Sequence, residues 1–318
     1  MSDFLVYLFT VVGIYGLISL SLSFQYGQTG LVNFGQVAFF MVGAYFSSIA
    51  TSILGLPIWL GFLFAILGGG VLGGLMALPI GDLKQDYWAI ATLAAAELIR
   101  IIFLNTNLRS DYVGASYGIS NIPAPFQDAF TSRQYGYVYL ALVIVCVLAA
   151  YLLVTWLDRT PFGRLLKGIR ESDEVARSLG KDVRRARIKA LIIGGALAGA
   201  GGSLYAHFVG FIDPRFFMPL ETFLVWAMVI MGGPGNNLGA LTGTLVIEAI
   251  YNSTRFIDVP SEYSATVAAL RMVLIGVLII LVILYLPQGL VPERKRRYPK
   301  PANTAAPPPS SPGERHAA

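Results

Sequence analysis

Two carboxylates lie within stretches that are otherwise apolar enough to cross a membrane. Glu97 follows the run ATLAAA, and Glu248 follows GTLVI. An ionised side chain in the middle of such a helix costs about 2.5–3.5 kcal/mol on a membrane-insertion scale, so each suggests an ion pair or a role in moving a solute. Arg100 lies three residues after Glu97 on the same helix face, and Arg255 and Arg271 are candidate partners of Glu248. For both carboxylates, the structural role and the transport role are open alternatives.

A second group of polar residues carries no charge. It consists of amides and a hydroxyl interleaved with glycines, namely Gln25, Gln28, Thr29, Asn33 and Gln36 with Gly27, Gly30 and Gly35. Neutral amides among apolar residues need hydrogen-bond partners. They either join helices together or face a cavity through which a polar molecule moves, with glycine permitting a broken helix there. The sequence GGPGNNLG at 232–239 is a second predicted break, and two separated breaks favour a transporter.

Motifs for catalysis and for metal binding are missing from the sequence. It contains no GxxxxGK[ST] phosphate loop and no HExxH. One cysteine, Cys146, and two histidines, His207 and His316, are too few for a cysteine or histidine metal site. We therefore expect this chain to be no enzyme and to hold no metal or cofactor. If ATP drives transport, the nucleotide binds to another chain.

The composition of the chain is that of a membrane protein. Of its 318 residues, 55% are hydrophobic and only 13% are charged, whereas soluble domains carry about 25% charged residues. The 34 glycines suit the close packing of membrane helices through small residues. The sequence therefore predicts an all-α polytopic membrane protein, and the position of its basic residues indicates membrane topology rather than nucleic-acid binding.

Seven apolar stretches are each long enough to cross the roughly 30 Å hydrocarbon layer. They lie at 4–22, 32–53, 57–80, 87–104, 137–156, 188–209 and 265–287. Residues 219–256 form two further apolar pieces on either side of GGPGNNLG. These pieces are either two spans joined by a cytoplasmic glycine turn or a re-entrant hairpin of broken helices. The total is about eight or nine transmembrane helices, some of them broken or re-entrant.

The most strongly charged interruption of the apolar pattern lies at 157–189. It holds ten of the 23 Lys and Arg residues together with five carboxylates, and this basic excess places it on the cytoplasmic side. Ser172 is a good N-cap for a short helix, and Asp173 and Glu174 suit the positive end of its dipole. Gly180 can adopt the left-handed conformation that ends it. A helix of about two turns is marginal alone, so we expect it to pack on the membrane domain or on a cytoplasmic partner.

The alternation of spans predicts the sides on which the two ends lie. Counting back from the cytoplasmic loop places the N-terminus outside, and counting forward places the C-terminus in the cytoplasm. Residues 105–136, which are rich in Gly, Pro, Asn and Tyr, form the longest outer loop. The chain is thus divided into a transmembrane domain at 1–292 and a basic, Pro- and Ala-rich tail at 293–318 that we expect to be disordered.

Several of these segments resemble a known family, the permease subunits of bacterial branched-chain amino-acid ABC importers, and within it the M-type subunit. The resemblance runs from about residue 13 to 292 and is strongest at GRLLKGIRESDEVARSLGKDVRRARIKALIIGGALAGAGGSLYAHFVGFIDPRFF (163–217). Four other family motifs are matched by GLVNFGQVAFFMVGAY (30–45), DYWAIATLAAAEL (86–98), MGGPGNNLGALTG (231–243) and LPQGLV (286–291).

The resemblance implies a permease in the bacterial inner membrane that moves branched-chain or other small amino acids and does not hydrolyse ATP itself. It implies three kinds of protein partner: a second, H-type permease subunit, two cytoplasmic ATPase subunits and a periplasmic solute-binding protein. It also implies that the ATPases couple to the short cytoplasmic helix and its flanks, namely Ile169, Arg170, Glu171, Ser172, Asp173, Glu174, Val175, Ala176, Leu179 and Gly180.

The expected solute path is lined by polar residues and glycines of these motifs, namely Asn33, Gln36, Tyr87, Thr92, Glu97, Gly232, Gly233 and Asn236. Gln36 stands where the family commonly has His, and Asn33 stands where M-type chains often have Ser. Because these differences lie on the expected path, urea or a short amide is an alternative solute. An ATP-independent channel or secondary transporter is the other alternative, and Glu97 and Glu248 are the residues that suggest it.

Overall fold

A computed structural model describes residues 2–81, 85–106, 118–127, 130–253, 264–286 and 288–293. Their regular secondary structure consists of helices and short helical turns, apart from one isolated antiparallel bridge between Ile119 and Ile212. The helices are α1 (Ser2–Thr29), α2 (Gln36–Ser48), α3 (Ile58–Met76), α4 (Gln85–Asn105), α5 (Ser132–Arg159), α6 (Pro161–Glu171), α7 (Asp173–Ser178), α8 (Val183–Val209), α9 (Pro219–Gly232), α10 (Asn237–Ser253) and α11 (Ser264–Tyr285). The predicted all-α fold is confirmed.

Seven helical segments among the described residues are long and apolar enough to cross a membrane. They are Asp3–Thr29, Gln36–Ile53, Ile58–Met76, Tyr87–Asn105, Gln134–Arg159, Val183–Val209 and Pro214–Gly232. α10 and the apolar part of α11, Ala269–Tyr285, are shorter. The chain is therefore a multi-pass membrane protein, as its composition predicts.

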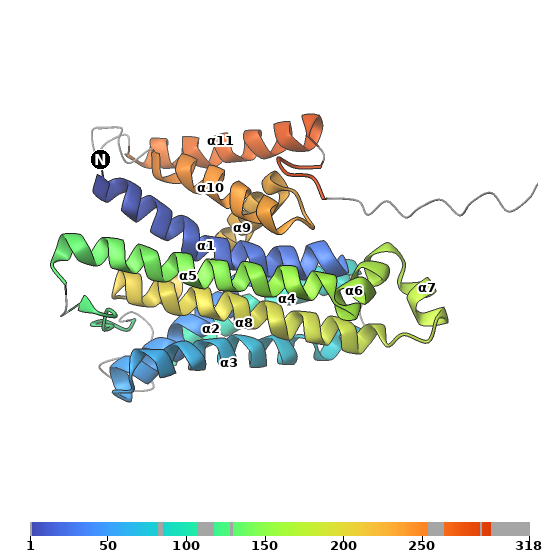
Figure 1. The fold of residues 1–318 in the computed structure, drawn as a ribbon, viewed down its shortest axis with the longest axis horizontal. Coiled ribbons are helices and arrows are strands. Elements are labelled where there is room, and N and C mark those ends of the chain that lie inside the picture. Colours follow the sequence, from blue (N-terminus) through green and yellow to red (C-terminus); the bar gives the residue numbers. More distant parts are fainter. Residues whose placement is uncertain are drawn as a thin grey trace, which may run out of the picture.

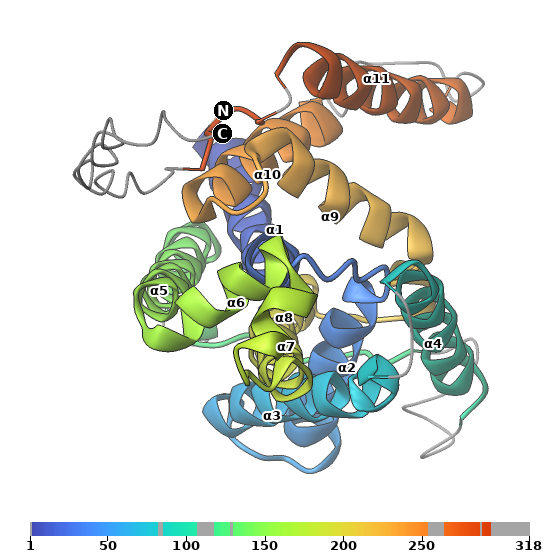
Figure 2. The same ribbon diagram turned by 90° about the vertical axis from the view of Figure 1, so that its right-hand side faces the viewer.

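The long helices lie side by side, with α8 at the centre of the main group. α8 packs against α1, α2 and α3, and α5 lies beside it (Figure 1). α6 and α7 lie at the end of the molecule opposite the start of α1; we refer to it as the α7 end. Figure 2 shows α9, α10 and α11 grouped on one side of α1, and α4 at the edge of the molecule near α2 and α9.

Small residues allow α8 to approach its neighbours closely. A Cβ atom added at Gly195 of α8 would collide with the backbone of Gly69 in α3, and one added at Gly202 would collide with the backbone of Phe40 in α2. Backbone contact of this kind requires glycine on the facing surfaces. The glycine runs of the sequence therefore hold α2, α3 and α8 together.

α9 and α10 form an antiparallel hairpin whose turn lies at the α7 end. The turn at Gly235 is close to Arg170 of α6, because a Cβ atom added there would lie 3.0 Å from Arg170 Nη1. From this turn α10 runs back toward the end at which α1 begins (Figure 1). The glycine turn of residues 219–256 thus lies beside the charged loop, and the choice between two spans and a re-entrant hairpin stays open.

Several predicted boundaries differ from the observed ones. α1 continues to Thr29 instead of ending at residue 22, whereas the predicted span at 32–53 becomes helical only at Gln36. The charged loop predicted at 157–189 is shorter, since α5 continues to Arg159 and α8 begins at Val183. In α1, α5 and α8 polar side chains continue a helix that apolar length alone does not reveal, whereas α2 starts later than its apolar stretch. Residues 107–117 and 128–129 of the outer loop predicted at 105–136, and the tail after residue 293, lie outside the described residues.

Candidate functional site

The first candidate site is the break between α1 and α2, which is buried inside the bundle. The backbone leaves α1 at Gly30, whose φ is +72°, and becomes helical again at Gln36. Between them, Asn33 Nδ2 donates a hydrogen bond of 2.8 Å to Gln25 Oε1, and Asn33 Oδ1 accepts one of 2.8 Å from Gly35 N. Trp226 Nε1 of α9 donates to the Asn33 carbonyl oxygen at 2.9 Å. Asn33 thus holds an irregular backbone in place between two helices.

Gln36 extends this network to α8. Its Nε2 donates to Ser21 Oγ of α1 at 2.7 Å, and Ser21 Oγ in turn donates to the Gly194 carbonyl oxygen of α8 at 2.6 Å. Gln36 Oε1 accepts a longer bond of 3.4 Å from Asn33 Nδ2. Both amides are fully buried, so they join helices, which is one of the two roles expected from the sequence. Their place on a solute path stays a prediction.

The start of α2 is held by hydroxyl groups from two other helices. The first N–H groups of a helix have no partner within the helix itself. Here Thr92 Oγ1 of α4 accepts from Phe34 N at 3.1 Å, and Thr222 Oγ1 of α9 accepts from Val37 N at 3.2 Å. The broken helix therefore starts inside the bundle at a point where α2, α4 and α9 meet.

Replacing Asn33 by alanine is expected to destabilise the protein. The change leaves the buried Gly35 N–H and Gln25 Oε1 without their partner, and each unsatisfied group costs about 1–3 kcal/mol. The thermal midpoint of the purified variant is therefore expected to fall well below that of wild type. Asn105→Ala is a suitable control, because Asn105 is exposed and donates only to the Ile101 carbonyl oxygen of its own helix. An unchanged midpoint for Asn33→Ala would contradict the network.

Beside the break lies a small pocket with a volume of about 10 Å³, the space for about one water. It is enclosed by residues of α2, α4, α9 and the segments before them: Phe34, Val37, Ala38, Met41, Leu93, Ala96, Glu97, Phe217, Pro219 and Thr222. Glu97 is the charged residue of this lining, and it accepts a hydrogen bond of 2.8 Å from Arg100 Nε. The ion pair expected from the i, i+3 spacing is present, and Glu97 also faces the pocket.

The other expected path residues lie outside this pocket. Tyr87 is in the first turns of α4 and is 63% exposed. Gly232 and Gly233 lie at the end of α9, where Gly232 O accepts from Val291 N at 2.9 Å. Asn236 Nδ2 donates to the Val291 carbonyl oxygen at 3.2 Å. The α9–α10 turn is therefore tied to the segment after α11.

The second candidate site is the short helix predicted in the charged loop. α7 begins and ends as expected: Ser172 Oγ accepts from Val175 N at 3.3 Å, and Gly180 has a φ of +71°. Arg187 Nη2 of α8 donates to Asp173 Oδ1 at 2.8 Å and holds α7 against the bundle. The structure adds the longer helix α6 just before α7, which the sequence analysis did not distinguish.

The expected coupling residues divide into an outer and an inner group. The outer residues are exposed, and they are Glu171, Glu174, Val175, Leu179 and Gly180. Ile169 and Ala176 are buried against the bundle. Arg170 is half-buried: its Nη1 donates to the Gly27 carbonyl oxygen at the end of α1, and its Nη2 donates to Glu293 Oε2 at 2.9 Å.

Comparison with known proteins places this arrangement in a family. Over residues 4–283 the chain matches the family described as the permease component of branched-chain amino acid transport systems. The chain belongs to this family. It is 32% identical to the probable branched-chain amino acid transport permease protein LivM of Methanocaldococcus jannaschii, over 89% of this chain and 91% of the relative.

Two further relatives distinguish the kinds of subunit to which this permease is similar. The high-affinity LivM permease protein of Escherichia coli K12 is 30% identical over 89% of this chain and 69% of its own length. The probable LivH permease protein of Methanocaldococcus jannaschii is 27% identical over 73% of this chain and 74% of its own length. The permease is thus more similar to these LivM proteins than to this LivH protein. No solved structure matches the chain.

The sequence analysis assigned no role to Glu221, a carboxylate in the first turn of α9 of this permease. Tyr15 OH of α1 donates to Glu221 Oε2 at 3.2 Å, and both side chains are half-buried. The signal that identifies Glu221 is the one that identified Glu97, a carboxylate within an apolar segment. Glu221 neighbours Thr222, so it lies close to the start of α2 and to the pocket beside the break.

Glu248 of α10 lies in a separate polar cluster. It is buried and accepts a hydrogen bond of 2.8 Å from Asn252 Nδ2 one turn later. Arg271 of α11 donates to the Tyr251 carbonyl oxygen at 2.9 Å, and its guanidinium lies 4.2 Å from the centre of the Tyr251 ring. Arg255, the other expected partner of Glu248, lies outside the described residues. These contacts join α10 to α11.

Proposed function

We propose that this permease is the M-type membrane subunit of an ABC importer for branched-chain amino acids in the bacterial inner membrane. In this proposal it pairs with a second permease subunit of the H type, and two separate cytoplasmic ATPases hydrolyse the ATP. A periplasmic binding protein delivers the solute. The names of the LivM and LivH relatives support the solute and the second permease.

The observation that carries the proposal is the outer face of α7. Val175 and Leu179 are 58% and 70% exposed although they are apolar, and they lie four residues apart on one side of the segment. Glu171 at the end of α6 and Glu174 in α7 are exposed charged residues close to them in sequence. A helix with apolar anchors at i and i+4 is the form that binds a groove of another protein. Since this chain has no phosphate-loop motif, an ATPase subunit is the partner that fits.

The proposed orientation places α6 and α7 in the cytoplasm and the N-terminus outside. The basic excess of the segment supports this, because such segments stay on the cytoplasmic side. α1 begins at the end opposite α7 (Figure 1). Lys167 Nζ of α6 donates to Glu293 Oε1 at 2.9 Å, so the described C-terminal residues belong to the cytoplasmic side in this proposal.

The solute path is proposed to run along the face on which α2, α4 and α9 meet. Its support is the pocket beside the buried break, with Glu97 at its wall and Thr92 and Thr222 close to it. A broken helix inside a membrane domain exposes polar groups that can bind a polar solute. The remaining expected path residues Tyr87, Gly232, Gly233 and Asn236 are part of this proposal, and they lie toward the α7 end of the path.

The proposal is tested by charge reversal on α7. Glu174→Arg is expected to lower co-purification of co-expressed ATPase subunits by about tenfold or more, since like charges placed in an interface cost several kcal/mol. Membrane insertion stays normal because the side chain is exposed. Lys181→Glu is the control, an exposed charge reversal in the loop after α7. Co-purification at full yield with Glu174→Arg, or leucine uptake into proteoliposomes that lack any ATPase, would contradict the proposal.

A further inference from the structure

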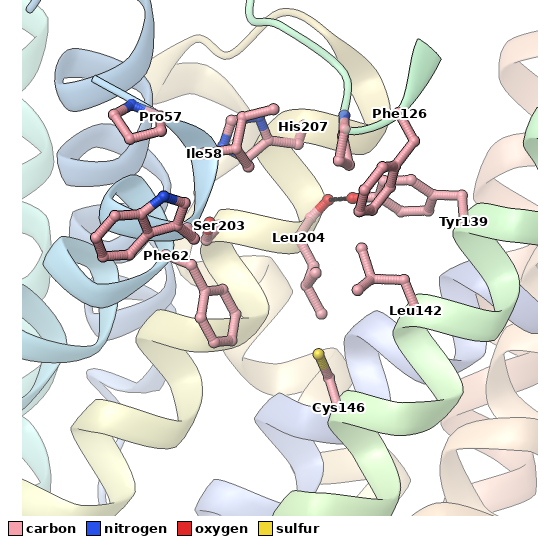
Figure 3. A pocket seen from close by; sticks show the side chains of 12 residues that line it. Pro57, Ile58, Phe62, Phe126, Tyr139, Leu142, Cys146, Ser203, Leu204 and His207 are labelled. Atoms are coloured by element: carbon pink, nitrogen blue, oxygen red, sulfur yellow. Dashed lines mark hydrogen bonds between the residues drawn. The ribbon is translucent and has the colours of Figure 1, made fainter. Parts of the chain in front are cut away.

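A wide groove lies between α3 and α5, with α8 as its floor (Figure 3). Its volume is about 540 Å³. Residues of these three helices, Pro57 just before α3 and the segment at 125–126 line it, namely Pro57, Ile58, Trp59, Phe62, Pro125, Phe126, Tyr139, Leu142, Cys146, Ser203, Leu204 and His207. None of these residues lines the pocket beside Glu97. The groove is therefore a separate feature of the molecule.

The polar side chains on the floor and wall of the groove already have partners within the protein. Tyr139 OH donates to the Leu204 carbonyl oxygen at 2.6 Å. Ser203 Oγ and His207 Nε2 are hydrogen-bonded to Ser47 Oγ at 2.7 and 2.9 Å. His207 Nδ1 is hydrogen-bonded to the Pro123 carbonyl oxygen at 2.6 Å. A polar solute thus finds few groups to bind here, whereas an apolar ligand leaves no buried polar group unsatisfied.

The groove is continuous with the surface that faces the bilayer. Trp59 at its rim is 68% exposed, and Leu63 of α3 and Ile144 of α5 are exposed beside the lining residues in sequence. An apolar surface on a multi-pass protein is solvated by lipid, and Trp is enriched at the edge of that layer. Figure 2 shows α3 and α5 on one side of α8, and α4 and α9 on the other. The groove thus lies away from the proposed solute path.

We propose that this groove binds one acyl chain of a membrane lipid. A hydrocarbon chain is flexible and apolar, and it reaches the groove directly from the bilayer. Its binding buries the apolar surfaces of Phe62, Leu142 and Leu204 and fills the space between α3 and α5. Such a lipid holds together two helices that have few direct contacts with each other.

Native mass spectrometry of the purified permease after detergent exchange tests the proposal with a matched pair of variants. Leu142→Trp fills the groove, whereas Leu148→Trp places the same side chain on the exposed face of the same helix. Wild type and Leu148→Trp are expected to retain one phospholipid per chain, and Leu142→Trp is expected to lose it. Retention of the lipid by Leu142→Trp, or no lipid on wild type, would overturn the proposal.

A second measurement needs no variant. Cys146 is the single cysteine of the chain, and its side chain lines the groove (Figure 3). Its alkylation by a maleimide is expected to be fast in delipidated wild-type protein and to slow when phosphatidylethanolamine is added in mixed micelles. An alkylation rate that does not respond to the lipid, or recovery of a second membrane protein in the groove by crosslinking from Cys146, would argue for a different occupant.

Discussion

Replacing Gly73 by alanine is expected to destabilise the helix bundle, whereas the same change at the adjacent Gly74 is expected to be neutral or slightly stabilising. A Cβ atom at Gly73 would meet the backbone of Leu191 in α8, with the carbonyl carbon at 2.8 Å. At Gly74 the nearest atom is Ile192 Cγ1 at 3.6 Å, an ordinary contact with a flexible side chain. The two positions therefore differ in packing and hardly in anything else.

The expected cost at Gly73 is large because backbone atoms cannot move aside without separating α3 from α8. Overpacking of a close-packed interface costs about 1–3 kcal/mol. In a helix interior, alanine is favoured over glycine by about 1 kcal/mol; this gain offsets part of the cost at Gly73 and is the remaining effect at Gly74. The two effects have opposite signs, so the comparison does not depend on the absolute stability of the protein.

Thermal unfolding of the purified variants in one detergent measures the difference. The midpoint of Gly73→Ala is expected to lie clearly below wild type, and that of Gly74→Ala at or above it. Equal midpoints for the two variants would mean that α3 and α8 are not in backbone contact at this point.

Features that depend on neighbours in sequence could be predicted. Ser172 and Gly180 act within one or two turns of their own positions, so the sequence predicted α7 correctly. The lengths of the apolar stretches predicted six of the seven spans for the same reason. The seventh is Pro214–Gly232 rather than the predicted 265–287, of which Ala269–Tyr285 is a shorter apolar helix. The i, i+3 spacing of Glu97 and Arg100 predicted their ion pair.

Features that depend on distant segments could not be predicted. Asn33 was recognised as a polar residue that needs partners, but its partner Trp226 lies 193 residues later in the chain. No local pattern decides whether such an amide joins helices or faces a cavity. The start of α2 at Gln36 also depends on distant residues, since Thr92 and Thr222 accept the hydrogen bonds that hold its first turn.

The contacts of Arg170 could not be predicted either, although Arg170 lies in the segment 163–217 that most strongly resembles the family. The family resemblance assigned it to ATPase coupling together with its neighbours. The structure places its guanidinium between Gly27 at the end of α1 and Glu293 after α11. It also approaches Gly235 in the α9–α10 turn. Arg170 therefore connects α6 to the end of α1 and to the segment after α11, whereas the exposed face of α7 is the surface available to a partner.

This difference in position predicts a difference in phenotype. If α7 binds the ATPases and Arg170 transmits their movement, Arg170→Ala is expected to leave ATPase co-purification intact and to lower leucine uptake per ATP hydrolysed. Hydrogen bonds to charged groups are worth about 1.5–3 kcal/mol each, so loss of the contacts with Gly27 and Glu293 is expected to reduce coupled uptake by about tenfold or more. Glu174→Arg is expected to show the opposite pattern, in which co-purification of the ATPases is lost first.

Two control variants separate the loss of the Arg170 contacts with Gly27 and Glu293 from a simple loss of charge. Arg164→Ala removes the same charge from the exposed side of α6, where its Nη1 reaches only the Arg159 carbonyl oxygen at 3.2 Å, so uptake is expected to stay near wild type. Glu293→Gln keeps the contact between Arg170 and Gly27 and is expected to give an intermediate loss. If Arg170→Ala and Arg164→Ala transport equally well, the movement of α7 reaches the membrane helices by another route, for which the buried Ile169 and Ala176 are the remaining contacts.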